Sequence, residues 1–144
     1  MRVMVLVKAT QNSETGLMPS EELLTAMGKY NEELARAGVL LSGEGLQPTS
    51  KAKRIVINGA SRRVIDGPFS ETKELVAGFW LWQVKSMEEA VEWARRCPEP
   101  IPGEVSELEI RPVFEAADFA EADPTGKLRE AEEQLRRRVE SRST

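Results

Sequence analysis

The first 40 residues alternate between an apolar run of strand type and a longer segment with apolar residues at helical spacing. The run Val3–Val7 predicts a first strand. The polar segment from Thr10 to Leu17 predicts a loop. A helix is expected to begin after Ser20, because its hydroxyl can cap free backbone N–H groups and two glutamates follow at the positive end of the helix dipole. Gly38 follows the last apolar position and is expected to end this helix.

The middle of the chain carries signals of shorter strands and a tight turn. Val39–Leu41 predicts a second strand, which runs into a Gly-x-Gly sequence. Arg54–Ile57 and Arg62–Ile65 predict two further strands. They are separated by Asn58-Gly59, and this dipeptide is typical of hairpins because both residues tolerate positive φ. A β-hairpin is therefore expected between the second strand and the rest of the fold.

The most apolar strand pattern is Leu75–Val84, with the sequence L-V-A-G-F-W-L-W-Q-V. Side chains of a strand point alternately to its two faces, so Phe79 and Leu81 share one face and Trp80 and Trp82 the other. Neither set is polar. Both faces of the sheet are therefore expected to be covered at this strand.

A second helix and a last strand complete this part of the chain. Ser86 and Glu89 form a capping box for the helix, and its apolar stripe ends at Cys97. Prolines at positions 98, 100 and 102 prevent its continuation. Glu107–Arg111 then alternates between polar and apolar residues, which indicates a half-exposed strand.

The predicted order of elements is β-α-β-β-α-β with an inserted hairpin, which favours an α+β, ferredoxin-like fold with an antiparallel sheet. Two helices can cover only one face of that sheet, yet the strand Leu75–Val84 is apolar on both. The simplest cover for the second face is another copy of the same sheet, so we expect a homodimer.

The character of the sequence changes near residue 115, where we place the end of the folded domain. Residues 116–126 are small and acidic and predict a linker. Residues 127–143 predict a charged helix with a narrow apolar seam. This helix could dock on the body as a solvated helix or pair with a second subunit. An anion-binding role of Arg136–Arg138 is a weaker alternative, because glutamates surround these arginines.

Length and charge exclude several classes of function. The 144 residues fit one domain, and a net charge of −4 disfavours a nucleic-acid partner. No apolar run approaches the about 20 residues needed to span a membrane. The N-terminal segment also lacks the basic region and cleavage site of a signal peptide, so a cytoplasmic location is expected.

The absence of histidine and the presence of a single cysteine limit the reactions that the chain could catalyse. There is no histidine, which removes the usual general base near neutral pH. The single cysteine, Cys97, is expected to be a small buried hydrophobe rather than a nucleophile. The Gly-x-Gly at positions 43–45 lacks the remainder of a phosphate-binding motif and predicts a bend. We therefore predict no cofactor and no metal.

One motif, R-R-V-I-D-G-P-F-S-E-T-K-E from Arg62, carries the candidate site. Asp66 can bond its own following backbone, Gly67 is expected to supply a permissive φ, and Phe69 to anchor the turn in the core. Glu71 and Lys73 share a face of an extended chain.

Asp66, Glu71 and Lys73 are therefore the candidate catalytic residues, placed around the mouth of a pocket. Two carboxylates beside a lysine could perform acid–base catalysis or bind a hard cation. The alternative is a turn with a solvated ion pair and no chemistry. The candidate pocket-lining residues are Phe69, Trp80 and Trp82.

The sequences D-G-P-F-S-E-T-K-E and G-F-W-L-W-Q-V together resemble the signature of the YCII-related proteins of the DGPF group. The resemblance runs from Met1 to about Glu115. It implies a dimeric α/β-barrel arrangement, bacterial origin and a cleft that fits a small molecule, but no settled reaction. Some relatives in the wider superfamily use a histidine–aspartate pair, which this chain cannot supply because it has no histidine. The group is also associated with extracytoplasmic-function sigma factors.

Two functions follow from the motif and the resemblance. The first is a homodimer that binds a small organic molecule in a cleft near the DGPF motif, with carboxylate and lysine acid–base catalysis as an option. The second is a non-enzymatic accessory or regulatory protein associated with a sigma factor.

Overall fold

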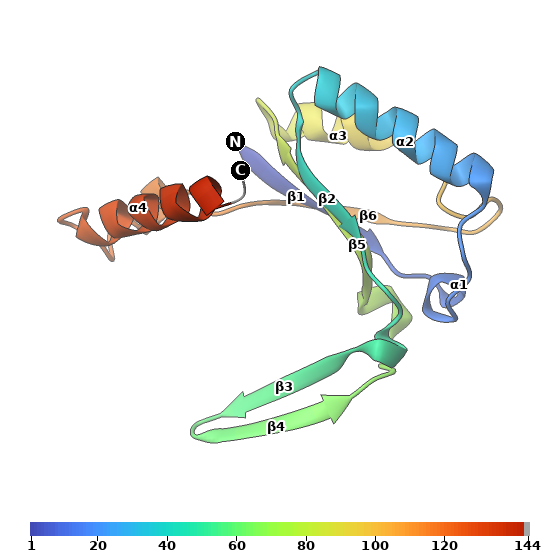
Figure 1. Cartoon of the computed structure of the whole chain (residues 1–144), viewed down its shortest axis with the longest axis horizontal. Helices are drawn as coiled ribbons and strands as arrows, with labels where there is room; N and C mark the ends of the chain where they lie inside the picture. Colours follow the sequence, from blue (N-terminus) through green and yellow to red (C-terminus); the bar gives the residue numbers. More distant parts are fainter. Residues whose placement is uncertain (143–144) are drawn as a thin grey trace. The chain divides into compact units, whose positions relative to one another are not determined.

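A four-stranded antiparallel sheet forms the centre of Met1–Pro112 in the computed structural model, which describes residues 1–142 (Figure 1). The order of strands across the sheet is β2-β5-β1-β6, and every neighbouring pair is antiparallel. The strands are β1 (Arg2–Lys8), β2 (Leu40–Gly45), β5 (Val76–Gln83) and β6 (Leu108–Pro112). Helices α2 (Glu21–Arg36) and α3 (Met87–Arg95) connect β1 to β2 and β5 to β6. The chain therefore has the predicted α+β, ferredoxin-like fold.

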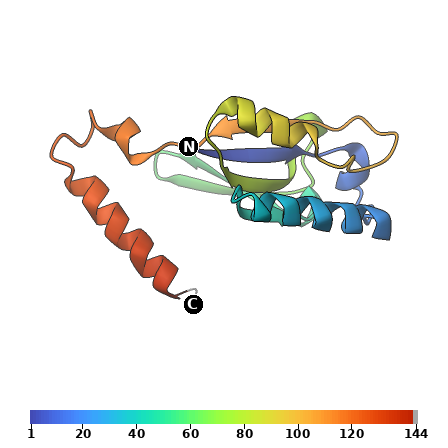
Figure 2. The same ribbon diagram turned by 90° about the horizontal axis from the view of Figure 1, so that it is seen from above.

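Helices α2 and α3 lie on the same face of the sheet (Figures 1 and 2). Each begins at its predicted serine: Ser20 Oγ accepts from Leu23 N–H, and Ser86 Oγ accepts from Glu89 N–H. The Tyr30 hydroxyl of α2 donates to the Trp93 carbonyl of α3 at 2.6 Å. This hydrogen bond ties the helices to each other above the sheet.

The core lies between these helices and the sheet. Val3 and Val5 of β1 are fully buried and face the buried Trp82 and Trp80 across the β1–β5 pair. Phe79 and Leu81 alternate with the tryptophans and lie on the opposite side. There they pair with Leu6 and Met4, and all four are half-buried. These four residues form what we call the open face, and the predicted alternation along β5 is confirmed.

The predicted hairpin forms a separate two-stranded sheet, which we call the arm. It consists of β3 (Lys53–Asn58) and β4 (Ser61–Asp66), and it extends away from the main sheet (Figure 1). Only Ile65 among its strand residues is not exposed. Short 3-10 turns flank the arm, η1 (Thr49–Lys51) before it and η2 (Thr72–Glu74) after it.

One local element differs from the prediction. Part of the segment expected to be a loop forms a four-residue helix, α1 (Gln11–Glu14). Thr10 and Ser13 make a reciprocal capping box at its start. Such a short polar helix has no apolar stripe, so periodicity alone could not reveal it.

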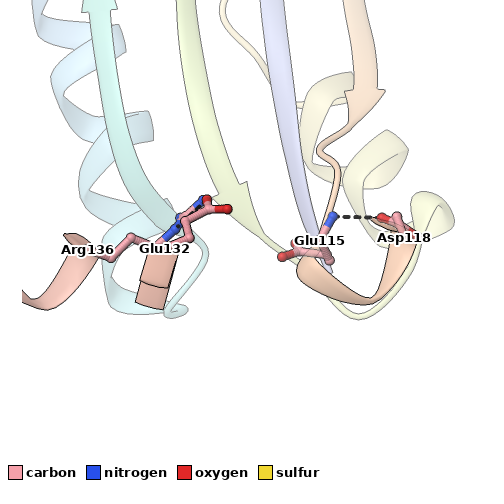
Figure 3. Close-up of polar contacts among 4 residues, drawn as sticks. All are labelled: Glu115, Asp118, Glu132 and Arg136. Atoms are coloured by element: carbon pink, nitrogen blue, oxygen red, sulfur yellow. Dashed lines mark hydrogen bonds and ion pairs between the residues drawn. The ribbon is translucent and has the colours of Figure 1, made fainter. Parts of the chain in front are cut away.

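The C-terminal unit begins at Val113 and is described by itself. The predicted linker contains a 3-10 turn, η3 (Ala116–Phe119), in which Glu115 N–H donates to Asp118 at 2.7 Å (Figure 3). The charged helix is α4 (Lys127–Arg142), and Arg136 donates to Glu132 one turn earlier (Figure 3). The predicted last helical residue, Ser143, lies outside the described residues. The domain end at residue 115 and the role of this helix stay predictions.

Candidate ligand cavity

A cavity of about 520 Å³ lies on the helix-covered side of the sheet, within Met1–Pro112. Most of its wall is apolar and comes from the α1–α2 connection, the first half of α2 and the loop before β6. Its main apolar side chains are Leu17, Met18, Leu23, Leu24, Met27 and Ile101. Ligand sites of proteins are typically concave and mostly apolar with a few polar groups, and this cavity has that composition.

The floor of the cavity is formed where β2 and β5 pair. Gly43 lies opposite Trp80, and a Cβ atom at Gly43 would lie 2.6 Å from Cδ1 of the indole. The glycine is therefore required because the ring occupies the space above it. The Gly-x-Gly that predicts a bend lies within β2 and accommodates Trp80.

Trp80 is held in place by Asn31 of α2. Its indole Nε1–H donates to Asn31 Oδ1 at 2.8 Å. Tyr30 packs edge-on against the same ring, with centroids 5.8 Å apart. Both Trp80 and Asn31 line the cavity. Asn31 was missed by sequence reasoning, although its position four residues after Met27 placed a polar side chain on the apolar side of the helix.

Ser106, which precedes β6, also lines the cavity, but its hydroxyl oxygen is not exposed to it. Its Oγ is buried and has no hydrogen-bond partner within residues 1–142. Thr10 and Ser13 also line the cavity, but their hydroxyls are engaged in the capping box of α1. No pattern in the sequence distinguished Ser106.

Two charged residues, Lys8 and Glu44, contribute to the wall from the sheet. They follow Val7 and Gly43, which face the helices because they pair with Gly78 and Trp80. Glu44 pairs with Phe79, so its side chain leaves the sheet on the open face, whereas Lys8 follows a register shift after Val7 and pairs with Val76, on the same side of the sheet as Gly78 and Trp80. Lys8 therefore contributes a positively charged side chain to the wall on the helix side of the sheet.

The DGPF motif forms a corner at the base of the arm rather than a wall of the cavity. Gly67 N–H donates to the Ala52 carbonyl at 2.9 Å, and the Gly67–Pro68 peptide bond is cis. The expectation that Gly67 supplies a positive φ is wrong, because the positive φ of the motif, 62°, is at Glu71. Glycine is needed at 67 because a Cβ atom there would lie 1.7 Å from the Thr49 carbonyl oxygen.

Thr49 links this corner to α1. Its backbone N–H and its hydroxyl both donate to the carboxylate of Glu14, and its hydroxyl accepts from Phe69 N–H at 3.1 Å. Glu14 belongs to the same short helix as Ser13, which lines the cavity. The corner therefore helps to hold one wall of the cavity, although it does not line it.

The three candidate catalytic side chains lie outside the wall of the cavity. Asp66 forms an exposed ion pair with Lys53 at 2.6 Å across the base of the arm. Lys73 lies in the turn η2 and Glu71 directly precedes it, and both residues are exposed. The catalytic role of these residues stays a prediction.

Of the three candidate pocket-lining aromatic residues, one lines the cavity and two do not. Trp80 lines the cavity, whereas Trp82 is fully buried in the core beside it. Phe69 is half-buried at the corner, where the Arg54 guanidinium lies 3.7 Å from its ring centroid.

The single thiol has no sign of activation. Cys97 is half-buried at the end of α3, and burial raises the pKa of its thiol to about 11. Within residues 1–142, no cluster of three or more His, Cys, Asp or Glu side chains could hold a metal ion. In the same residues no helix is both long enough and apolar enough to cross a membrane.

Comparison with known proteins identifies the family of the chain. The YCII-related domain matches residues 1–114. The chain belongs to the YCII-related family. An uncharacterized protein of Rhizobium meliloti (strain 1021), R00369, is similar to this YCII-related chain and 32% identical over 93 residues. The aligned residues cover 65% of this chain and 74% of the Rhizobium protein.

Proposed function

We propose that this YCII-related protein is a homodimer that binds a small organic molecule in the cavity over Trp80. The observation that carries the proposal is the cavity itself, with an apolar wall and a hydrogen-bonded indole. A space of about 520 Å³ lies in the range of small-molecule sites. We take this cavity as the cleft expected near the DGPF motif, because it lies beside α1, which the motif contacts through Thr49 and Glu14.

A ligand screen by thermal unfolding tests the binding function, because a ligand that binds only the folded state raises the melting temperature. Leu24→Trp should block the cavity mouth, since Leu24 lines the cavity and is 60% exposed. Leu46→Trp is the matched control at an exposed leucine outside the wall. We expect ligand-induced shifts that disappear in Leu24→Trp and persist in Leu46→Trp. Shifts that persist in Leu24→Trp, or a broad screen without any shift, would contradict the proposal.

Support for the dimer comes from the open face. Met4, Leu6, Phe79 and Leu81 form an apolar cluster on the side of the sheet opposite α2 and α3 (Figures 1 and 2). A continuous apolar surface of this kind is unfavourable in water and typical of interaction sites. Sedimentation should show a dimer at micromolar concentration, and Leu81→Glu should shift it to monomer. A well-behaved wild-type monomer would contradict this part of the proposal.

The alternative is an accessory protein that acts through the arm. Ile55, Ile57 and Val64 are 54%, 66% and 57% exposed on it. Positions 51–66 hold five basic residues and one acidic residue, in a chain of net charge −4. An exposed ribbon that is both apolar and basic fits an acidic protein surface. Binding to a purified extracytoplasmic-function sigma factor, lost in Ile57→Glu and Arg62→Glu, would favour this alternative. Unchanged binding in both variants would exclude the arm as its contact.

A further inference from the structure

We propose that the ligand of the cavity is an apolar monocarboxylate, and that the ammonium group of Lys8 is the counter-ion of its carboxylate. This inference rests on the proposed binding function and specifies the ligand class of the same site. It follows from the register shift that directs Lys8, from the charges of the wall, and from what the rest of the wall offers to a ligand.

Lys8 belongs to the wall of the cavity because the pairing of β1 with β5 shifts at this point. Val7 pairs with Gly78 on the helix side of the sheet. Its neighbour Lys8 pairs with Val76 instead of Ala77, so Lys8 lies on the helix side as well and lines the cavity. Irregularities of this kind re-aim a side chain and are frequent beside active sites. The shift therefore adds a lysine to a wall that is otherwise mostly apolar.

Backbone hydrogen bonds hold Lys8 at this position on both sides. The N–H of Lys8 donates to the Glu107 carbonyl at 3.0 Å, and the N–H of Ala9 donates to the Leu75 carbonyl at 2.9 Å. Lys8 is half-buried, and Ala9 is buried beside it. The register shift is thus a fixed part of the sheet rather than a frayed strand end.

The charge of Lys8 has no counter-ion in the part of the chain that the structure describes. The other charged residue of the wall, Glu44, pairs with Phe79 and leaves the sheet on the open face. Within residues 1–142, no carboxylate forms an ion pair with Lys8. A half-buried ammonium group has lost part of its hydration, and an anionic ligand would replace it with a charge-assisted hydrogen bond.

A single lysine favours a ligand with one negative charge. Lysine is a compact point charge on a flexible stem, and a carboxylate balances it one to one. A phosphate monoester carries a charge of about −1.5 to −2 at neutral pH, and the excess would have no counter-ion in this wall. A ligand amine is a cation at neutral pH and would be repelled by Lys8. The wall therefore selects a monoanion.

The rest of the wall fits a hydrocarbon body. Trp80 pairs with Val5, which lies three residues before Lys8, so the two ends of the floor are about 10 Å apart along the sheet. Helix α2 covers this floor with the apolar side chains of Leu23, Leu24 and Met27. A flat ring system fits between them with its body over the indole and its carboxylate at Lys8.

Four probes test this ligand class, and three of them share one ring system. They are 2-naphthoate, a monoanion at pH 7.5, its neutral amide 2-naphthamide, and 2-naphthylmethylamine, a cation at that pH. Acetate is the fourth and carries the anion without the body. Dissociation constants are measured by NMR titration, followed at the indole N–H of Trp80.

We expect 2-naphthoate to bind about tenfold more tightly than 2-naphthamide, the difference that a charge-assisted hydrogen bond confers. The amine and acetate should bind more weakly than 2-naphthamide, because the first is repelled and the second buries no apolar surface. Binding of 2-naphthamide, the amine or acetate as tight as that of 2-naphthoate would overturn the proposal.

Variants of two lysines locate the counter-ion. Lys8→Met keeps most of the stem and removes the charge, so 2-naphthoate should lose about tenfold in affinity while 2-naphthamide is unaffected. Should Lys8→Met fail to fold, Lys8→Gln removes the same charge with a polar side chain, and the same result is expected. Lys29→Met is the matched control, because Lys29 is exposed on α2 outside the wall. It should leave both affinities unchanged. An undiminished preference for 2-naphthoate in the Lys8 variant would overturn the assignment of Lys8.

Failure of this inference is distinguishable from failure of the binding function. If 2-naphthoate and 2-naphthamide bind equally and Leu24→Trp abolishes the binding of both, the cavity is a ligand site but the anion preference is wrong. If Leu24→Trp does not affect their binding, the cavity is not their site and both proposals fall. If 2-naphthoate does not bind at all, the inference falls, and the broad ligand screen still decides the binding function.

Discussion

Gly67→Ala tests whether the DGPF corner is a close-packed joint of the backbone. The added Cβ atom would lie 1.7 Å from the Thr49 carbonyl oxygen and 3.3 Å from the Ala52 carbonyl oxygen. Both are backbone atoms, which cannot rotate away as the end of a side chain can. Gly67 does not have a positive φ, so the effect predicted here comes from this steric overlap alone.

The size of the loss follows from what must move. Overpacking of a close-packed site costs about 1–3 kcal/mol. Separation of the two segments would also weaken the Gly67–Ala52 hydrogen bond of 2.9 Å and the Phe69–Thr49 hydrogen bond of 3.1 Å. Each is worth about 1 kcal/mol. We expect the free energy of unfolding to fall by about 2–5 kcal/mol in Gly67→Ala.

Urea denaturation of the variant and the wild type measures this difference directly. Gly45→Ala is the matched control, because a Cβ atom at Gly45 would meet nothing within 4 Å and its φ is not positive. Its stability should stay within about 0.5 kcal/mol of the wild type. If Gly67→Ala is as stable as Gly45→Ala, the corner is not the tight joint that the structure indicates.

The remaining predictions concern other parts of the chain. Glu71→Gln and Lys73→Met should each change the free energy of unfolding by less than about 1 kcal/mol in thermal melts, since exposed charges contribute little. A loss as large as that of Gly67→Ala would show that these charges are structural. A chain that ends at Glu115 should stay soluble and folded by circular dichroism, whereas precipitation would make the C-terminal unit part of the fold. Burial raises the pKa of Cys97 from 9.0 to about 11, so folding favours the neutral thiol and stability falls as pH rises above 9. Urea denaturation of Cys97→Ala should show a shallower fall between pH 9 and 10, and an unchanged slope would contradict the burial of the thiol.

The sequence predicted those features that depend on local pattern. The serine caps, the two-sided alternation along β5 and the arm all follow from residues close together in the chain. The short helix α1 was missed because its stability depends on a capping box rather than an apolar stripe.

The site could not be predicted in the same way, because it depends on contacts between distant segments. Asn31 and Trp80 are 49 residues apart, and their hydrogen bond depends on how α2 packs over β5. The motif singled out Gly67, but the reason for glycine there is steric: the Thr49 carbonyl that excludes a side chain belongs to the segment that precedes the arm. The charged residues of the motif attracted a chemical interpretation, whereas the polar groups of the cavity wall, Asn31 and Ser106, lie in segments without any motif.

The most direct test of the account is an NMR titration with the tightest compound from the thermal screen. The account predicts that the indole N–H of Trp80 and the side-chain amide of Asn31 shift first and most strongly, because both line the cavity. The backbone amides of Glu71 and Lys73 should then change little, since these residues lie outside its wall. Strong shifts at Glu71 and Lys73 with an unchanged Trp80 signal would contradict the account and place the site at the DGPF motif.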